Sequence, residues 1–262
     1  LNYLTAADFK DGKPGEFWPV DVHLIGKDIL RFHTIIWPAI LMALNIPLPE
    51  KIFAHGWWTM ENEKMSKSKG NIVNPLDLIA RYGTDSFRYF LLREVPFGLD
   101  GEYSEEKFIK RYNSDLANDL GNLVNRTINL VEKLFNGIFP ANTLSTEMEQ
   151  LIDNVITKVD NSMLNVSFTD ALDNIWEIVN TLNRLLDLEK PWNAPLETAK
   201  VTISQCISGI SIVSLLVYPF IPTTSKKIWK MLNINFKEDK IQINKDVLTM
   251  PQNTKTQERE IL

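Results

Sequence analysis

The hydrophobic positions along this chain change their period near residue 74. Before that point, short apolar runs at residues 20–25 and 51–54 predict two buried strands. Between them, apolar side chains recur every three or four residues and the pattern stops before Pro47, which predicts one helix. That helix carries the series Ile29, Phe32, Ile36, Ile40 and Leu44. A strand, a crossover helix and a second strand predict a parallel α/β unit, with too little sheet for a complete domain.

After residue 74 the period is helical. Asn74 is suited to cap a helix that starts with Pro75 and ends at Gly83, and a second helix starts at Thr84. Ser104 is suited to cap a long helix with the stripe Phe108, Tyr112, Leu116, Leu120, Leu123, Thr127, Leu130 and Leu134. Segments 148–159, 168–186 and 201–218 offer partner helices, so the pattern predicts an antiparallel α-helix bundle.

The predicted fold class is therefore α/β plus all-α, in four segments. Residues 1–60 form the α/β part, and residues 61–106 form a connector made of a loop and helices. Residues 107–235 form the antiparallel helix bundle, and residues 236–262 form a C-terminal tail with a short strand near 240–244.

Composition narrows the class of protein. The chain has 262 residues, of which 44% are hydrophobic and 23% charged, and this excludes a disordered or fibrous protein. The net charge is −5, and the chain has no basic tail. The single cysteine, Cys206, forms no internal disulfide. The longest nearly apolar stretch, residues 210–221, is too short to span a bilayer. The first residues lack a signal-peptide profile, so we expect a cytoplasmic protein, with an organellar matrix as the alternative. Because the sequence begins at Leu1, we also expect it to be a piece of a longer chain.

The most distinctive local feature is a lysine-rich segment after the second strand. A flexible loop with two ammonium groups and hydroxyl donors suits a polyphosphate, whose leaving oxygen gains charge during displacement. A solvated lysine-rich turn is the alternative. The segment nevertheless matches the KMSKS loop of class I aminoacyl-tRNA synthetases letter for letter, and the resemblance implies that these residues contact ATP: Lys64, Met65, Ser66, Lys67 and Ser68.

Four further strings resemble methionyl-tRNA synthetases. They are HLIGKDILRFH at residues 23–33, HGWW at 55–58, RYFLLRE at 88–94 and NSDLANDLGNL at 113–123. The resemblance covers roughly residues 1–235. It implies that the α/β part is the second half of a Rossmann domain and that the helix bundle binds an anticodon.

A methionine pocket is expected on the predicted helix of the α/β part. Ile29 and His33 are four residues apart and share a helix face, where an apolar wall meets an imidazole. An unbranched thioether suits such a pocket. A packed core histidine is the alternative for His33. The resemblance implies that Ile29, His33 and Tyr3 line the methionine pocket.

An adenylate site is expected beside it. Gly26 and Asp28 follow a strand end, where open α/β sheets bind ligands, and Asp28 can accept hydrogen bonds from ribose hydroxyls. A helix N-cap is the alternative for Asp28. The resemblance implies that Gly26 and Asp28 face the ribose and that His55 lies near the adenine.

The predicted bundle has a candidate RNA site. Asn122 and Arg126 adjoin on one helix face, and Trp192 follows a proline in a turn, which suits the stacking of an unpaired base. A solvated polar pair and a core tryptophan are the alternatives. The resemblance implies that Asn122, Arg126 and Trp192 read the CAU anticodon.

The resemblance implies a complete reaction. ATP, bound with Mg²⁺, activates methionine to methionyl-adenylate, and the methionyl group is then transferred to tRNA-Met. Lys64 and Lys67 are the catalytic candidates, and no residue is assigned as a metal ligand. A first Rossmann half and an inserted domain that often holds zinc are expected outside this chain, so we expect the chain alone to be inactive. A free-standing RNA-binding module that recognises an anticodon-like loop is the alternative from another class. We expect no membrane partner, and the sequence leaves the oligomeric state open.

Overall fold

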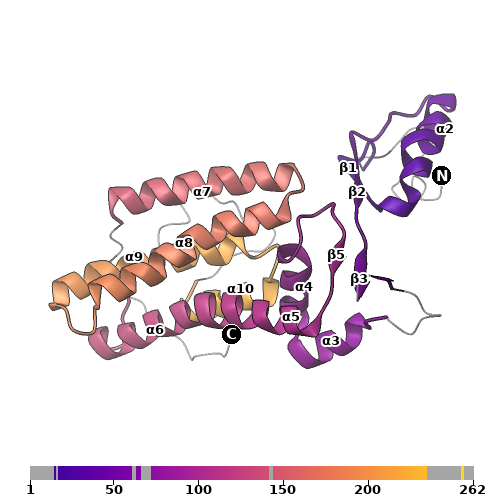
Figure 1. The fold of residues 1–262 in the computed structure, drawn as a ribbon. Coiled ribbons are helices and arrows are strands. Elements are labelled where there is room, and N and C mark those ends of the chain that lie inside the picture. The colour runs from indigo at the N-terminus through magenta and orange to yellow at the C-terminus, as the bar shows by residue number, and fades with distance from the viewer. Residues whose placement is uncertain are drawn as a thin grey trace. The chain divides into compact units, whose positions relative to one another are not determined.

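The computed structural model describes residues 15, 17–60, 63–65, 72–141, 144–234 and 255–256 (Figure 1). The described residues belong to two compact units. The first contains residues up to 72 together with Phe97–Tyr103, and the second contains Val73–Pro96 and the residues from Ser104 onward. These units divide the expected connector, residues 61–106, between them. The functional segment boundaries at residues 60, 106 and 235 stay a prediction.

A parallel strand pair forms the centre of the first unit. Strand β1 (Val22–Gly26) pairs with β2 (Lys51–His55), and Gly26 lies opposite His55 at their carboxyl ends. The crossover consists of the 3₁₀ turn η1 (Lys27–Ile29), the π-helical turn η2 (Phe32–Ile36) and helix α2 (Trp37–Ala43). This confirms the strand, helix, strand pattern.

The core of this unit is small. Its buried apolar cluster comprises Trp18, Leu41 and Ile46, and the Trp18 Nε1 donates to the Pro47 carbonyl oxygen at 2.8 Å. A second sheet has the order β4 (Glu63–Lys64), β3 (Trp58–Met60), β5 (Gly101–Glu102). Strand β4 is antiparallel to β3, and β5 is parallel to it.

The second unit begins with two helices whose ends follow the predicted signals. Helix α3 (Pro75–Tyr82) is capped by Asn74, whose side chain accepts from the Leu76 N–H at 3.1 Å. Gly83 ends the helix with a φ of 83°, which a residue with a Cβ rarely adopts. Helix α4 (Thr84–Arg93) follows immediately. The predicted cap, start and stop are confirmed.

The predicted long helix is present but is not uniform. Helix α5 (Glu105–Arg111) begins at the Ser104 cap and continues through the π-helix η4 (Tyr112–Gly121) into α6 (Asn122–Phe135). The stripe advances by four residues from Phe108 to Leu120, a step that lies between the 3.6 residues per turn of an α-helix and the longer turn of a π-helix. The predicted long helix is therefore confirmed, with a π-helical middle part.

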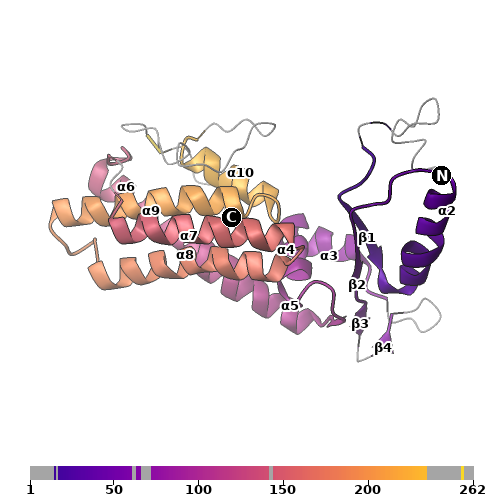
Figure 2. The same ribbon diagram turned by 90° about the horizontal axis from the view of Figure 1, so that it is seen from above.

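Four more helices complete the bundle: α7 (Thr146–Leu164), α8 (Phe168–Glu189), α9 (Leu196–Leu216) and α10 (Pro222–Met231). Helices α7, α8 and α9 run side by side and contact one another, and α9 also contacts α6 and α10 (Figures 1 and 2). Every residue from 202 to 217 is buried. The main hydrophobic core of this unit therefore surrounds α9. The α/β plus all-α class is confirmed.

Helix α9 also bears on the question of a membrane span. Among the described residues it is the one helix long and apolar enough to cross a bilayer, and 89% of its most apolar window is buried inside the protein. The apolar stretch at residues 210–221 covers only the end of this helix and the turn after it, and the partner helix expected over residues 201–218 is confirmed with a start at Leu196. Its apolar surface is covered by the neighbouring helices. The strand expected at 240–244 lies outside the described residues.

Candidate functional sites

The predicted adenylate residues meet at the carboxyl ends of β1 and β2. A Cβ placed on Gly26 would lie 3.7 Å from the Asp28 Oδ2 and 3.9 Å from the His55 Cε1, so these three residues border one space. The Asp28 Oδ2 accepts a 2.6 Å hydrogen bond from the Trp57 indole N–H. Asp28 lies inside η1, and Gly26 occupies the capping position, so the N-cap alternative for Asp28 was wrong. The structure brings Gly26, Asp28 and His55 together at the edge where open α/β sheets bind ligands.

An ion pair between Lys27 and Asp100, which the sequence did not predict, lies at this edge. The Lys27 Nζ lies 2.6 Å from both carboxylate oxygens of Asp100 and 4.0 Å from the centre of the Trp57 ring. The Trp57 backbone N–H also donates to the Asp100 Oδ1 at 2.8 Å. The hydrogen bonds from Lys27 and from the Trp57 backbone hold the pKa of Asp100 below its usual value. No local signal links Lys27 to an acid 73 positions away.

The methionine-pocket candidates occupy the crossover. The His33 Nδ1 lies 3.0 Å from the Ile29 carbonyl oxygen, which only accepts, so Nδ1 carries the proton. In the neutral ring, Nε2 is then an acceptor. Ile29 is 42% exposed. His33 is half-buried, so the prediction of a fully packed core histidine does not describe it.

A second histidine, His23, packs its ring edge to face with His33. The Trp37 indole N–H donates to the His23 Nε2 at 3.1 Å, and the His23 ring lies 6.1 Å from the His33 ring with an edge-to-face orientation. Burial of His23 and the neighbouring His33 lower the pKa of His23 below 6.5. The sequence did not single out His23 or Trp37. The two residues are fourteen positions apart, with His23 in β1 and Trp37 at the start of α2.

The lysine-rich segment begins on a hairpin strand. Lys64 pairs through its backbone in β4 with Thr59 of β3, and Met65 follows half-buried. Ser66, Lys67 and Ser68 lie outside the described residues, as does Tyr3. Their assignments, and that of the Lys64 side chain, stay predictions.

The predicted RNA-reading residues lie close together in the helix bundle. The Arg126 guanidinium is 5.6 Å from the centre of the Trp192 ring, within cation–π range, although 66 positions separate the two residues. The Asp187 Oδ1 accepts from the Arg126 Nη2 at 2.7 Å. Trp192 is 45% exposed, so it is not the core tryptophan of the alternative interpretation. Asn122 is exposed one helical turn before Arg126.

A cavity of about 300 Å³ opens between these residues. Its lining consists of Arg126, Asn129, Leu130, Lys133 and Trp192. Sequence reasoning missed Asn129 and Lys133, although both continue the helical spacing that starts at Asn122 and Arg126. The site combines a flat indole, a guanidinium, an amide and an ammonium group, which is the chemistry that binds an unpaired nucleotide.

Comparisons with known proteins identify the family of this chain. Residues 1–128 match the family described as "tRNA synthetases class I (M)", and residues 146–261 match the "Anticodon-binding domain of tRNA ligase". The methionine–tRNA ligase of Caldanaerobacter subterraneus is 46% identical over 245 residues, which cover 89% of this chain and 38% of that protein. The chain belongs to the methionyl-tRNA synthetase family.

Other methionyl-tRNA synthetases give the same result. The Clostridium tetani methionine–tRNA ligase is 45% identical over 89% of this chain and 38% of its own length. A crystal structure of the Mycobacterium tuberculosis methionyl-tRNA synthetase bound by methionyl-adenylate matches with a TM-score of 0.87 and 36% identity, over 98% of this chain and 53% of that one. The present chain therefore spans well under half the length of the curated methionyl-tRNA synthetases it matches.

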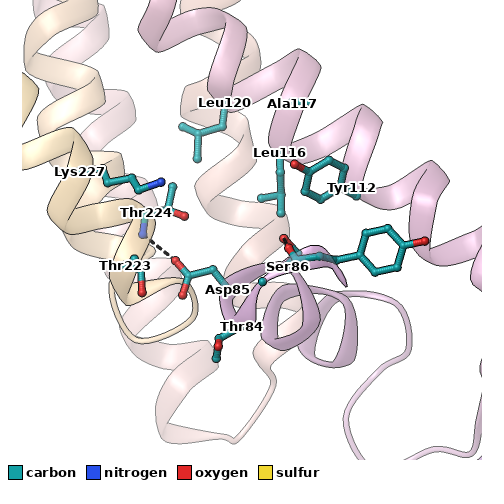
Figure 3. A pocket seen from close by; sticks show the side chains of 12 residues that line it. Thr84, Asp85, Ser86, Tyr112, Leu116, Ala117, Leu120, Thr223, Thr224 and Lys227 are labelled. Atoms are coloured by element: carbon teal, nitrogen blue, oxygen red, sulfur yellow. Dashed lines mark hydrogen bonds between the residues drawn. The ribbon is translucent and has the colours of Figure 1, made fainter. Parts of the chain in front are cut away.

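Another cavity of this synthetase-family chain lies elsewhere in the second unit. It has a volume of about 450 Å³ and is bordered by α4, η4 and the start of α10 (Figure 3). Its polar lining includes Asp85, whose Oδ2 accepts from the Thr224 backbone N–H at 2.6 Å near the N-terminus of α10. None of the predicted site residues lines it. No group of three or more acidic, histidine or cysteine side chains suited to a metal occurs among the residues that the structure describes.

Proposed function

We propose that this chain forms part of a methionine–tRNA ligase, which uses ATP to activate methionine and then charges tRNA-Met. The assembly of Gly26, Asp28 and His55 at the strand ends carries this proposal, since it offers a site for an adenylate beside Ile29 and His33. The relatives named methionine–tRNA ligase support methionine as the amino acid.

The proposed chemistry is a displacement at the α-phosphate of Mg²⁺-bound ATP. The methionine carboxylate attacks the α-phosphorus, and the bond to pyrophosphate breaks, so that methionyl-adenylate forms without a side-chain nucleophile. Lys67 would stabilise the negative charge of the phosphate and the departing pyrophosphate, and Lys64 would assist it. Asp28 would accept from a ribose hydroxyl, and its hydrogen bond from Trp57 keeps the carboxylate at the strand edge.

We further propose that the chain supplies only the second Rossmann half, the KMSKS segment and the anticodon reader, and that it is inactive alone. Support comes from apolar side chains that the first unit leaves exposed, among them Leu24, Ile29, Leu30, Phe32, Ile35, Ile36, Ile40, Met42, Leu44 and Leu48. A surface of this kind is usually covered by another part of the protein. A zinc site, in this proposal, belongs to a part outside the chain. We place the protein in the cytoplasm, with an organellar matrix as the alternative.

A pyrophosphate exchange assay tests the catalytic proposal. In the complete synthetase, Lys67→Ala should lower kcat for methionine-dependent exchange and leave the KM for methionine nearly unchanged, because the lysine acts on the transition state. The isolated 262-residue chain should show no exchange above its own Lys67→Ala variant. Unchanged exchange in the complete variant would remove Lys67 from the mechanism.

The anticodon proposal has a separate test. A labelled RNA hairpin with a CAU loop should bind the chain more tightly than a hairpin with one anticodon base changed. Trp192→Ala should weaken binding, since base stacking on an aromatic side chain contributes about 1–3 kcal/mol. Equal affinity for the two hairpins, or an unchanged affinity in Trp192→Ala, would contradict the assignment.

A further inference from the structure

One face of α6 has polar side chains beyond the two that are assigned to the anticodon. Asn122, Arg126, Asn129 and Lys133 follow one another at steps of four, three and four residues, so their side chains form a single row along the helix. The last three line the 300 Å³ cavity with Leu130 and Trp192. The row therefore extends past Arg126 by two residues that have no assigned role.

We propose that Lys133 binds the backbone phosphate of the nucleotide that stacks on Trp192, and that Asn129 contacts the edge of the same base. This inference rests on the proposed anticodon function and adds two residues to it. The ligand is one unpaired ribonucleotide with its phosphate, held by stacking, one amide and one ammonium group.

The charge balance in the cavity points to Lys133 as the phosphate contact. Asp187 pairs with Arg126 at 2.7 Å, so the positive charge of the guanidinium is offset by a carboxylate on α8. A phosphate that approaches the cavity meets Lys133 as the other cationic side chain of the lining. An ammonium group acts as a point charge and suits a phosphate oxygen, whereas the guanidinium suits a planar base edge.

The walls of the cavity account for the role of Asn129. Leu130 and the Trp192 indole supply apolar surfaces, and a base between such surfaces exposes its polar edge to the side. Asn129 is half-buried in the same lining. Its amide offers both donors and an acceptor, which are the groups needed to distinguish one base edge from another.

A lysine in the last turn of a helix also has a simpler role, since it interacts favourably with the helix dipole. The two roles differ in their salt dependence. Fluorescence anisotropy of a labelled CAU hairpin, measured at several salt concentrations, gives the slope of log affinity against log salt. Removal of one phosphate contact to a single strand should make this slope shallower by about 0.7.

We therefore expect Lys133→Gln to reduce the slope by about 0.7 and to weaken the CAU and changed hairpins alike. Lys110→Gln is the matched control, because Lys110 is an exposed lysine in the last turn of a different helix, α5. Asn129→Ala should instead reduce the preference for CAU by roughly 2- to 10-fold, the effect of one hydrogen bond. Circular dichroism melts of each variant verify that the fold is retained.

The outcomes separate this inference from the function on which it rests. If the unaltered chain prefers CAU and depends on Trp192, but Lys133→Gln keeps the slope of the Lys110→Gln control, the phosphate contact is refuted and the anticodon function stands. An unchanged CAU preference in Asn129→Ala refutes the base contact in the same way. If the unaltered chain shows no CAU preference, both the anticodon function and this inference fail.

Discussion

Replacement of Asp115 by alanine should strongly destabilise the helical unit, because this carboxylate is buried and has several partners. Asp115 is 6% exposed and lies in the π-helix η4. Its Oδ2 accepts from the Tyr89 hydroxyl at 2.8 Å and from the Arg111 Nη1 at 3.2 Å, and lies 3.6 Å from the Arg93 Nε. Its Oδ1 accepts from the Ser114 hydroxyl at 2.5 Å.

The magnitude follows from what the substitution leaves behind. Tyr89 is fully buried and Arg93 is 13% exposed, so both would lose a partner where water does not replace it. Removal of one partner from a buried ion pair costs about 3–5 kcal/mol. For a cooperative unit of this size, each kcal/mol lowers Tm by about 2–4 °C. Asp115→Ala should therefore lower Tm by about 6–20 °C.

The matched control is Asp173→Ala. Asp173 is 58% exposed and lies 2.5 Å from the Nη2 of the same arginine, Arg93. An exposed ion pair contributes about 0–1 kcal/mol, so the control should lower Tm by no more than about 4 °C. Far-UV circular dichroism measures both transitions, since the helical unit dominates the signal. If the two variants melt within about 2 °C of each other, then the reasoning from burial is wrong.

Four further outcomes follow from the structure. Asp85→Ala should destabilise α10 by about 1 kcal/mol in urea denaturation, whereas Asp85→Asn, which keeps an acceptor for the backbone N–H, should lose less. Cys206 is buried with a pKa of about 12, so its labelling by a thiol reagent should proceed only as fast as the bundle opens. Gly56→Ala should increase proteolysis of the first unit and leave the helical signal unchanged, because a Cβ would lie 2.3 Å from the Leu99 carbonyl oxygen. The lowered pKa of His23 means that the folded first unit resists protonation, so its stability should fall as the pH drops below 6.5, and an NMR titration should place the His23 midpoint below that value.

The elements that the sequence predicted well are those specified by neighbouring residues. Asn74, Pro75 and Gly83 act within one helix, and Ser104 accepts from the Lys107 N–H three positions away. Interactions of this range depend on local backbone geometry alone, so a sequence pattern is sufficient to identify them. The parallel strand pair was predictable for a similar reason, because its crossover is short.

The parts that sequence missed depend on residues far apart in the chain. Lys27 and Asp100 form an ion pair although 73 positions separate them. The backbone N–H of Thr224 donates to Asp85, which lies 139 positions away. The π-helical winding of η4 lies within a pattern that also fits an α-helix, since the four-residue step of the stripe does not distinguish the two windings. In contrast, Asn129 and Lys133 were within reach of sequence reasoning, because the spacing that joined Asn122 to Arg126 continues through them.

The KMSKS segment connects the first unit to the second along the chain. The segment starts at Lys64 in β4, which belongs to the first unit, and it is followed by Asn74, which caps α3 in the second unit. Helix α3 packs on α4, and α4 contacts both α8 and α10. The buried Asp115 cluster further joins α4 to η4, so the downstream anchor of the segment is part of the same helical framework that carries Arg126 and Trp192.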